Sequence, residues 1–531
     1  MAPSDGPQPL PAPRQVASAS ASTATGPSGD VGVNRGARDT MAGTAPARVR
    51  RITSGVARRR RIRQISIGPR VRMLLGSMLV AFAAWLFLPV PALTATVPPP
   101  SRAAAQPGLP WLSTSGDRIV DSTGRAVLLR GFNVDALLEP TMHPSPLEAT
   151  DAALMQQSGF DVVRLPIAWS QLEPERGYFD STYLDSITRA VALLNSHGLY
   201  VVLDMHSLGW SPAYGGSGAP AWATVQGVPD PVWGPMPSLG RLLSPAINVS
   251  TAYFWLSSDL QAQYFDAWTF VVQRFRHDSG VAGYDVINEP HSFPLPPFRF
   301  DKDQLWPFYA HAVEVLGAAD PNHLFFLDND MTGDLPTSIV PLHAPNIVYA
   351  PHVYTGSLIP PNFTGDPHAL QTHVNELVSE GASVPAPVWF GEFSINIGDS
   401  YSAQWIDAVL GDFDAHHAGW AWWQWRETSG YGVRSKTGKV NTSLLRLLAR
   451  PYLAAAPEGA VARYLARSAT LQIRVPAAHD AATIDVAWPV TVLGPPRSSS
   501  TCGATVTWDA GVARMAVYLP GGSGCEVTVT R

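Results

Sequence analysis

Tyr284-Asp285-Val286-Ile287-Asn288-Glu289-Pro290 is an apolar run that ends in Asn-Glu-Pro, and it predicts a buried strand with a carboxylate at its C-terminal end. A second apolar run, Val388-Trp389-Phe390-Gly391-Glu392-Phe393, reaches a glutamate in the same way. A (β/α)8 barrel carries its catalytic groups at this end of its parallel strands. Two glutamates in this position predict acid and nucleophile chemistry on a sugar, although either one alone is more often a surface or salt-bridged residue.

Apolar runs alternate with helical stretches throughout the region around these two glutamates. Six further runs predict buried strands, at residues 119–133, 160–167, 199–206, 323–327, 347–352 and 419–425. Eight alternations of strand and helix predict an α/β fold, a (β/α)8 TIM barrel, over residues 111–449. No Gly-rich phosphate loop follows any run, which argues against a doubly wound sheet. Residues 450–531 hold short alternating runs and predict a small C-terminal antiparallel β-sandwich domain.

The first 105 residues differ in composition from the rest of the chain. They hold 14 Arg and Lys against 3 Asp and Glu, a net +11, so with a total of −5 the remainder carries −16. An acidic folded part argues against nucleic acid as its ligand. Residues 1–47 are rich in Pro, Ala, Ser, Gly and Thr, and residues 48–72 hold ten arginines and no acid. We predict that residues 1–72 are a disordered, Arg-rich cytoplasmic segment.

An apolar stretch, residues 73–97, directly follows the basic segment. This order directs the N-terminus to the cytoplasm and the following chain outward. The unbroken part before Pro89 is about 16 residues long, shorter than the roughly 20 that a spanning helix prefers, so it is either a signal anchor or a signal peptide. We expect export in both cases, either membrane-anchored with an extracytoplasmic catalytic domain or secreted after cleavage. Residues 98–110 are a Pro-rich linker.

Two further features concern the cysteines and the longest irregular stretch. The chain has only Cys502 and Cys525, for which we predict one local disulfide, with two free buried thiols as the alternative. Residues 207–257 are rich in Gly, Pro and aromatic residues, and they predict a long functional loop with exposed aromatic side chains, among them Trp210 and Trp255.

The ordered set of motifs resembles clan A glycoside hydrolases of family 5, over nearly all of residues 110–450. The matching features are Asn288-Glu289-Pro290, Gly391-Glu392, Arg164, His206, His352-Val353-Tyr354 and a Trp-rich last strand. The resemblance implies a hydrolase without a metal or other cofactor, in which Glu289 is the acid/base and Glu392 the nucleophile. The substrate-binding residues that it implies are Arg164, Asp204, His206, Asn288, His352, Tyr354 and Trp423.

The chemistry of a retaining hydrolase sets requirements for these residues. Its two carboxyls lie roughly 5 to 5.5 Å apart, so that one attacks the anomeric carbon while the other protonates the leaving oxygen. Glu289 must then be protonated at rest and Glu392 ionised. We expect the environment to raise the pKa of Glu289, and donors such as Arg164 and Tyr354 to keep Glu392 charged. Asn288 would bind the sugar 2-hydroxyl.

The supporting residues have alternative interpretations. Arg164 could bridge an acidic rim, and His206 and His352 could be core histidines. A zinc site from both histidines and a glutamate is a further alternative, but no His-Glu-His helix motif supports it. The resemblance favours Trp423 as the sugar platform, whereas strand alternation places Trp425 on the same face.

Within the family, the chain is similar to the endoglycoceramidase-related group, which releases glycan or sugar from sphingolipid glycosides. The similar features are a barrel followed by a sandwich, the Asp204-Met205-His206 turn and the Arg450-Pro451-Tyr452 junction. The aromatic loop and residues 293–300 could form an apolar groove for lipid or fold onto the barrel. After the Asp-x-His turn the endoglycoceramidase group continues with Gln-Asp, whereas Ser207-Leu208 follows here. The polar pair that would help to hold a glucose unit is absent, so we expect the contacts to the sugar headgroup to differ.

These observations predict a retaining β-glycosidase that hydrolyses glycolipid-like substrates of the endoglycoceramidase or glycosylceramidase type. Glucosyl- or galactosyl-lipids, steryl glucosides and aryl glycosides all stay open as substrates, and the membrane is a predicted partner. One alternative is a secreted β-1,4-glucanase or mannanase of the same fold. Another is a non-catalytic carbohydrate- or lipid-binding surface protein.

Overall fold

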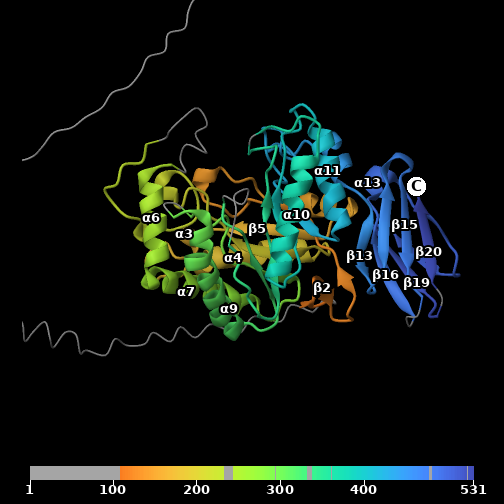
Figure 1. Cartoon of the computed structure of the whole chain (residues 1–531), viewed down its shortest axis with the longest axis horizontal. Coiled ribbons are helices and arrows are strands. Elements are labelled where there is room, and N and C mark those ends of the chain that lie inside the picture. The colour runs from red at the N-terminus through yellow and green to blue at the C-terminus, as the bar shows by residue number, and fades with distance from the viewer. Residues whose placement is uncertain are drawn as a thin grey trace, which may run out of the picture. The chain divides into compact units, whose positions relative to one another are not determined.

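The computed structural model describes residues 108–531, except for 232–242, 293–294, 332–337, 360, 478–480 and 523 (Figure 1). The predicted cytoplasmic segment 1–72, the signal segment 73–97 and most of the linker 98–110 lie outside the described residues. Within the described residues, no helix combines the length and the apolar character that crossing a bilayer requires.

A parallel sheet forms the centre of the larger part of the fold, in the order β10-β11-β12-β4-β5-β6-β7-β8-β9. Its strands are β4 (Arg130–Asn133), β5 (Val162–Ile167), β6 (Tyr200–Met205), β7 (Val281–Asp285), β8 (Leu324–Leu327), β9 (Ile347–Tyr349), β10 (His352–Val353), β11 (Trp389–Phe393) and β12 (Gly419–Trp422). Only two residues separate β9, which pairs with β8, from β10, which pairs with β11. These two short strands therefore act as one barrel strand and close the sheet. The predicted (β/α)8 barrel is confirmed.

Helices cover the outside of this barrel (Figure 1). They are α2 (Ala149–Gln157), α3 (Trp169–Leu172), α4 (Ser181–Asn195), α6 (Pro245–Leu256), α7 (Ser258–Phe275), α8 (Pro297–Phe300), α9 (Trp306–Ala319), α10 (His368–Ser383), α11 (Ser402–Ala415) and α12 (Thr442–Leu448). In α4, Asp180 caps the first turn through the Thr182 and Tyr183 N–H groups, and an apolar stripe faces the sheet. The sheet lies between side chains on both faces, so every residue of β5 and β6 is buried.

Two antiparallel sheets, built mainly from strands that follow the barrel in sequence, pack as a sandwich. One has the order β1-β2-β3-β13-β16-β19-β18 and the other β14-β15-β20-β17. The strands are β1 (Leu112–Ser115), β2 (Arg118–Asp121), β3 (Ala126–Val127), β13 (Tyr452–Ala456), β14 (Val461–Leu465), β15 (Thr470–Val475), β16 (Ala482–Ala487), β17 (Arg497–Ser500), β18 (Thr505–Asp509), β19 (Arg514–Leu519) and β20 (Cys525–Thr530); the short helix α13 (Val490–Leu493) lies beside them. The N-terminal hairpin β1–β2 thus belongs to the same sheet as strands from the C-terminal region. The alternation of apolar and polar residues within each strand does not reveal this pairing. A disulfide joins Cys502 to Cys525 across Cα atoms 5.2 Å apart.

The prediction that residues 207–257 form one long loop is wrong for Pro245–Leu256, which forms α6. Trp210 and Trp255, expected to be exposed, are each only 6% exposed. Trp255 donates its indole N–H to the His291 carbonyl at 3.1 Å and packs edge-on against Phe300. A buried indole needs a partner for its N–H, and the His291 carbonyl provides it. Trp210 and Trp255 therefore belong to the apolar core that also contains the buried residues of the barrel.

Candidate active site

Glu289 lies four residues beyond β7, in a backbone conformation that side chains rarely adopt. Its φ is +41°, in the left-handed region, which costs on the order of 1 kcal/mol or more for a residue with a Cβ. The backbone N–H of Glu289 donates to a carboxylate oxygen of Asp328 at 2.8 Å, and Asp328 directly follows β8. This bond helps to hold the strained turn, so the carboxyl of Glu289 is fixed at the barrel's mouth with 22% of its side chain exposed.

Glu392 lies within β11, and only 5% of its side chain is exposed. One carboxylate oxygen accepts a hydrogen bond from Arg164 Nη1 at 2.6 Å, and the other accepts from the Tyr354 hydroxyl at 2.9 Å. Both oxygens are therefore held by donors that stabilise a negative charge. Glu289 differs, because its side chain contacts His352 Nδ1 at 3.1 Å and no guanidinium.

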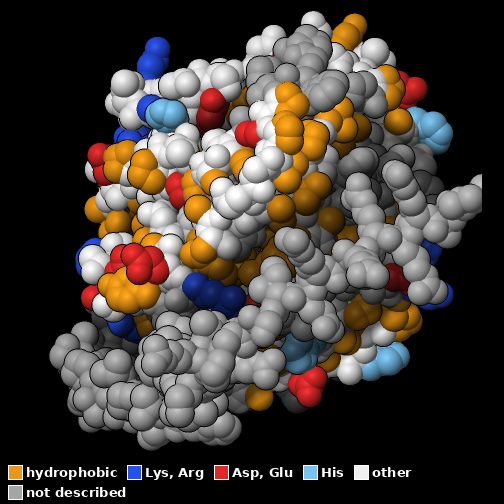
Figure 2. Space-filling view, turned by 90° about the vertical axis from the view of Figure 1, so that its left-hand side faces the viewer, with side chains coloured by type: hydrophobic (Ala, Val, Ile, Leu, Met, Phe, Trp, Pro, Cys, Tyr) orange, Lys and Arg blue, Asp and Glu red, His pale blue; other side chains and the backbone are white. Residues whose placement is uncertain are grey.

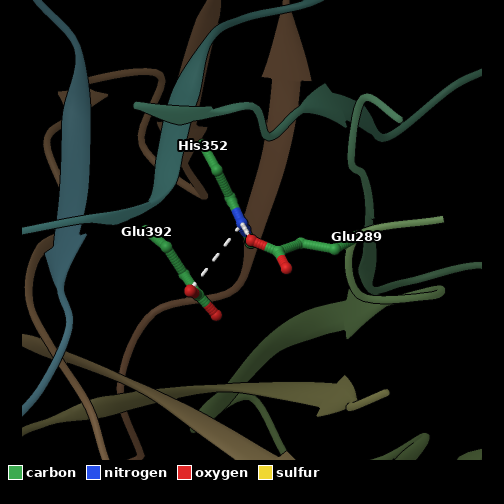
Figure 3. Close-up of side chains that lie close together, drawn as sticks. All are labelled: Glu289, His352 and Glu392. Carbon is green, nitrogen blue, oxygen red and sulfur yellow. Dashed lines mark hydrogen bonds and ion pairs between the residues drawn. The ribbon is translucent and has the colours of Figure 1, made fainter. Parts of the chain in front are cut away.

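The two glutamates and His352 point toward one another across the mouth of the barrel (Figure 3). His352 Nδ1 lies 3.1 Å from Glu289 Oε1 and 3.8 Å from Glu392 Oε2. One oxygen of each carboxylate and this ring nitrogen all lie within 4.8 Å of one another. Carboxyls about 5 Å apart suit a retaining glycosidase, whereas an inverting enzyme needs space for a water molecule between them.

Arg164 is fully buried and organises the floor of the site. Besides Glu392, its guanidinium donates to Asp285 at 2.8 Å and to Asn288 Oδ1 at 2.8 Å. Asp204 lies 3.1 Å from Nη1. Asn288 in turn donates its side-chain N–H to the Ser207 carbonyl at 2.9 Å. Arg164 was predicted to bind substrate, and the structure places it beneath Glu392 and Asn288, where it positions both groups.

His206 and Trp423 form one wall of the site. His206 Nδ1 lies 2.9 Å from Asp204 Oδ2, and its ring stacks on Trp423 with centroids 5.4 Å apart and planes 9° from parallel. Trp423 is partly exposed, whereas Trp425 is 1% exposed and donates its indole N–H to Asp151 at 2.8 Å. Of these two candidates for a sugar platform, only Trp423 presents an open ring.

Burial raises the pKa of both Glu289 and Glu392 above the usual range. For Glu289 this agrees with the requirement for an acid. At Glu392 burial raises the pKa, while the neighbouring His352 and Arg164 lower it. Arg164 and Tyr354 both donate to this carboxylate, and that they keep it charged stays a prediction. Burial also lowers the pKa of His352 to about 3, so its ring is neutral at physiological pH. Because burial raises the pKa of both glutamates, their hydrogen bonds decide which one holds the proton. Donors to Glu392 favour its ionised form, so the proton stays on Glu289.

The geometry also tests the alternative of a metal site. Among the described residues, the group of side chains close enough to hold an ion is Glu289, His352 and Glu392, without His206. Arg164 and Tyr354 already engage both oxygens of Glu392, and a guanidinium beside a cation is unfavourable. The donor set therefore suits acid–base work better than metal binding.

Sequence reasoning missed Asp285 and Asp328 as parts of the site. Asp285 ends β7 within the quoted run, and Asp328 directly follows β8, so both stand at the C-terminal ends of strands. The rule that singled out Glu289 and Glu392 applies to them equally. They lie below the open surface, at 0% and 1% exposed, and act on the site through Arg164 and the Glu289 backbone.

An apolar pocket opens beside Glu289. Its wall includes Leu208, Trp210, Ile247, Trp255 and Met331. A second, more polar hollow that also includes Glu289 is lined by Asn329, His352 and Tyr354. The acid therefore borders two environments of different polarity.

A (β/α)8 barrel with a glutamate pair at the mouth is the arrangement of a glycoside hydrolase. The sequence profile described as Cellulase (glycosyl hydrolase family 5) matches residues 120–429, which is more than half of the chain. The chain belongs to glycosyl hydrolase family 5, and it is a glycoside hydrolase.

Relatives and solved structures narrow the similarity within this family. The chain is 27% identical to endoglycoceramidase I of Rhodococcus hoagii over 368 residues, 63% of this chain and 71% of that protein. A structure described as the lactosyl-enzyme intermediate of endo-glycoceramidase II from Rhodococcus sp. is 26% identical, with a TM-score of 0.68, covering 77% of this chain and 98% of that one. A structure of an endogalactoceramidase is 27% identical, with a TM-score of 0.67, covering 80% and 100%.

Proposed function

We propose that this protein is a retaining β-glycosidase that cleaves the bond between a sugar headgroup and a lipid, as endoglycoceramidases or glycosylceramidases do. Glu392 is the nucleophile and Glu289 the acid/base. The observation that carries the proposal is the pair of carboxylates within 4.8 Å, of which only Glu392 is held by Arg164 and Tyr354.

The reaction proceeds in two displacements. The Glu392 carboxylate attacks the anomeric carbon while the bond to the leaving oxygen breaks and Glu289 gives that oxygen its proton. Water then attacks the glycosyl-enzyme ester, Glu289 takes the proton from that water, and Glu392 leaves as a carboxylate. The similarity to a structure described as a lactosyl-enzyme intermediate supports the covalent step.

The apolar pocket beside Glu289 supports a lipid aglycone. A leaving group lies next to the acid that protonates it, so the aglycone of a bound substrate would lie against this pocket. Leu208, Ile247 and Trp255 give this small pocket an apolar wall, which suits the first carbons of an alkyl chain better than a sugar hydroxyl. Relatives named for ceramide substrates support the same assignment.

The headgroup contacts differ from those of the endoglycoceramidase group at one place. Ser207 uses its carbonyl to hold Asn288, and Leu208 is 36% exposed at the rim of the pocket. The Gln-Asp pair of the group has no counterpart here, so a small headgroup such as a single glucose or galactose fits the proposal best.

The test is hydrolysis of a substrate panel by the full chain in detergent. The panel holds glucosylceramide, galactosylceramide, a steryl glucoside and cellooligosaccharides, with the Glu392→Gln variant run in parallel. We expect turnover of a lipid glycoside that disappears in the variant, with release of the β-anomer first, as seen by NMR. Turnover of oligosaccharides alone would instead support a glucanase, and initial release of the α-anomer would contradict retention.

We also propose that the protein is exported, on the basis of the basic and apolar order of residues 48–97. The measurement is fractionation of cells that express the full chain, followed by N-terminal sequencing of the product. A product in the medium that starts after Ala92 to Ala95 or after Ala105 supports cleavage, and an intact chain in the membrane fraction supports an anchor. An intact chain in the cytosol contradicts export.

A further inference from the structure

The surface helix α6 (Pro245–Leu256) has apolar residues on its outer side as well as its inner side. It contains no charged residue. Val249, Tyr253 and Leu256 follow one another at helical spacing and are 43%, 48% and 77% exposed, and Leu243 just before the helix is 62% exposed. We call Val249, Tyr253 and Leu256 the α6 outer face. Exposed apolar residues scattered singly are ordinary, but three on one helical stripe indicate a contact surface.

The next helix provides an internal comparison. The helix α7 follows α6 after a single residue, and its exposed side includes Asp259, Asp266, Gln273 and Arg274. That is the usual polar outer face of a barrel helix. The apolar outer face of α6 is therefore a local property of this helix.

The opposite side of α6 belongs to the candidate active site. Ile247, Thr251 and Trp255 line the pocket that also contains Glu289. Asn248 and Trp255 both bind His291, two residues after Glu289, at 2.6 and 3.1 Å. Figure 2 looks onto the side where α6 lies in Figure 1 and shows hydrophobic side chains gathered on it. One helix thus separates the pocket from an apolar outer surface.

We propose that the α6 outer face inserts into the surface of a neutral lipid bilayer or micelle and places the apolar pocket next to the lipid that carries the substrate. This inference rests on the proposed glycolipid substrate. It adds the surface of the protein through which the enzyme contacts the lipid that contains this substrate. The occupant is the acyl-chain boundary of a lipid surface, which accepts Val, Tyr and Leu side chains at helical spacing.

Charges around the helix indicate the kind of lipid. Asp230 accepts a hydrogen bond from Ser244 at the N-terminus of α6, and Asp259 beyond its C-terminus pairs with Arg176. Within Pro245–Leu256, which the structure describes in full, there is no Lys or Arg of the kind that draws interfacial helices to anionic lipids. Binding should therefore occur on phosphatidylcholine and change little with salt.

The first test places a reporter on the α6 outer face of the full chain. Both native cysteines form a disulfide, so Leu256→Cys introduces the free thiol for an environment-sensitive fluorophore. The matched control is Tyr518→Cys, at a 47% exposed tyrosine of the sandwich. On phosphatidylcholine vesicles we expect a salt-insensitive blue shift at residue 256, with quenching by spin-labelled acyl chains, and little change at residue 518.

Each other outcome of this experiment overturns the proposal. An unchanged spectrum at residue 256 means that α6 stays in water. Equal shifts at both sites mean non-specific adsorption, and a concentration-dependent shift without lipid means that a second copy of the chain covers the helix. Because the fluorophore reports contact and not catalysis, the outcome is independent of whether the protein hydrolyses the panel.

The second test separates access to lipid from chemistry. The double variant Val249→Thr/Tyr253→Gln is compared with Val461→Thr/Tyr518→Gln, which changes the same residue types on the sandwich. We expect the α6 variant to lose at least about fivefold in turnover of glycosylceramide in phosphatidylcholine vesicles, because two apolar side chains no longer enter the lipid. Its kcat/KM on a soluble aryl β-glycoside should stay within about twofold. Equal loss on both substrates contradicts the proposal, and a parent chain inactive on every glycoside contradicts the proposed function alone.

Discussion

The two ends of the barrel handle buried charge differently. At the catalytic end one arginine, Arg164, lies within 3.1 Å of carboxylate oxygens from Asp204, Asp285 and Glu392. At the end that meets the sandwich, Arg125, Arg130 and Arg514 pair with four aspartates, since Arg125 bridges Asp121 and Asp485. Arg130 pairs with Asp414 at 2.7 Å and Arg514 with Asp161 at 3.4 Å, while the Arg130 guanidinium lies 4.6 Å from the centre of the Tyr452 ring.

This difference indicates which end is arranged for chemistry. Buried carboxylates in excess of their cations keep protons, so burial raises the pKa of Asp204 to about 7 and that of Asp285 to about 7. Such an arrangement costs stability and suits proton transfer to a leaving group. At the sandwich end three arginines pair with four aspartates, so the charges are closer to balance than around Arg164, which suits a structural contact. Substitutions at the first end should therefore affect activity most, and those at the second end stability.

The largest effect is expected for Glu392→Gln. The amide keeps the shape of the side chain but cannot attack the anomeric carbon, so kcat should fall by at least about a thousandfold. Removing one of several buried carboxylates around Arg164 should leave thermal stability unchanged or raised. Steady-state kinetics and a thermal melt measure both, with Asp414→Asn as the control at the sandwich end. A variant that is strongly destabilised would break the contrast between the two ends.

Glu289→Gln should have the next largest effect, and it should depend on the leaving group. Loss of the general acid should lower kcat/KM about 100- to 10,000-fold on a lipid glycoside, whose alkoxide leaves poorly without a proton. A dinitrophenyl glycoside leaves without protonation, so its first step should lose much less. Comparing the two substrates for one variant is the measurement. Equal losses would show that Glu289 is not the acid, and would move that role elsewhere at the catalytic end.

The difference between the two ends also explains what the sequence predicted. Glu289 and Glu392 end apolar runs, so the sequence pattern alone predicts them as a catalytic pair, whereas His206 and Tyr354 are predicted through the resemblance to family 5. The eightfold alternation of strand and helix predicted the barrel, because parallel strands buried on both faces leave a clear apolar signal.

Other features depended on contacts between distant parts of the chain. The pKa of Glu392 is raised because the side chain is buried, and the spacing of apolar residues along the sequence does not show how deeply one side chain is buried. The helix α6 lacks the polar outer face by which an amphipathic helix is recognised, so its residues were interpreted as part of a loop. The pairing of β3 with β13, by which the N-terminal hairpin joins a C-terminal sheet, spans more than 300 residues and has no local signature.

The pH dependence of stability should differ between wild type and Asp204→Asn. Asp204 has a pKa of about 7 in the folded protein and an ordinary value of 3.8, so the folded state holds an extra proton between these values. Its contribution to stability is present below about pH 4 and is lost as the pH rises toward 7. Wild type should therefore lose about 2 to 4 kcal/mol relative to the variant between pH 4.5 and 7.5. Urea unfolding across that range measures the slope, and parallel slopes would show that Asp204 is ionised throughout.

The smallest effect is expected at the sandwich end, for Arg514→Gln. The substitution leaves Asp161 with a weaker partner, and burial already raises the pKa of that aspartate above its usual range. Because a quarter of the Arg514 side chain is exposed and the charges are 3.4 Å apart, we expect a loss of about 1 to 2 kcal/mol, less than for a fully buried pair. Activity on a soluble aryl glycoside should stay within about twofold, since the change is at the opposite end from Glu289 and Glu392. Calorimetry and kinetics on one preparation measure both quantities. A large loss of activity without a loss of stability would mean that the sandwich end takes part in catalysis, and the separation of roles between the two ends would fail.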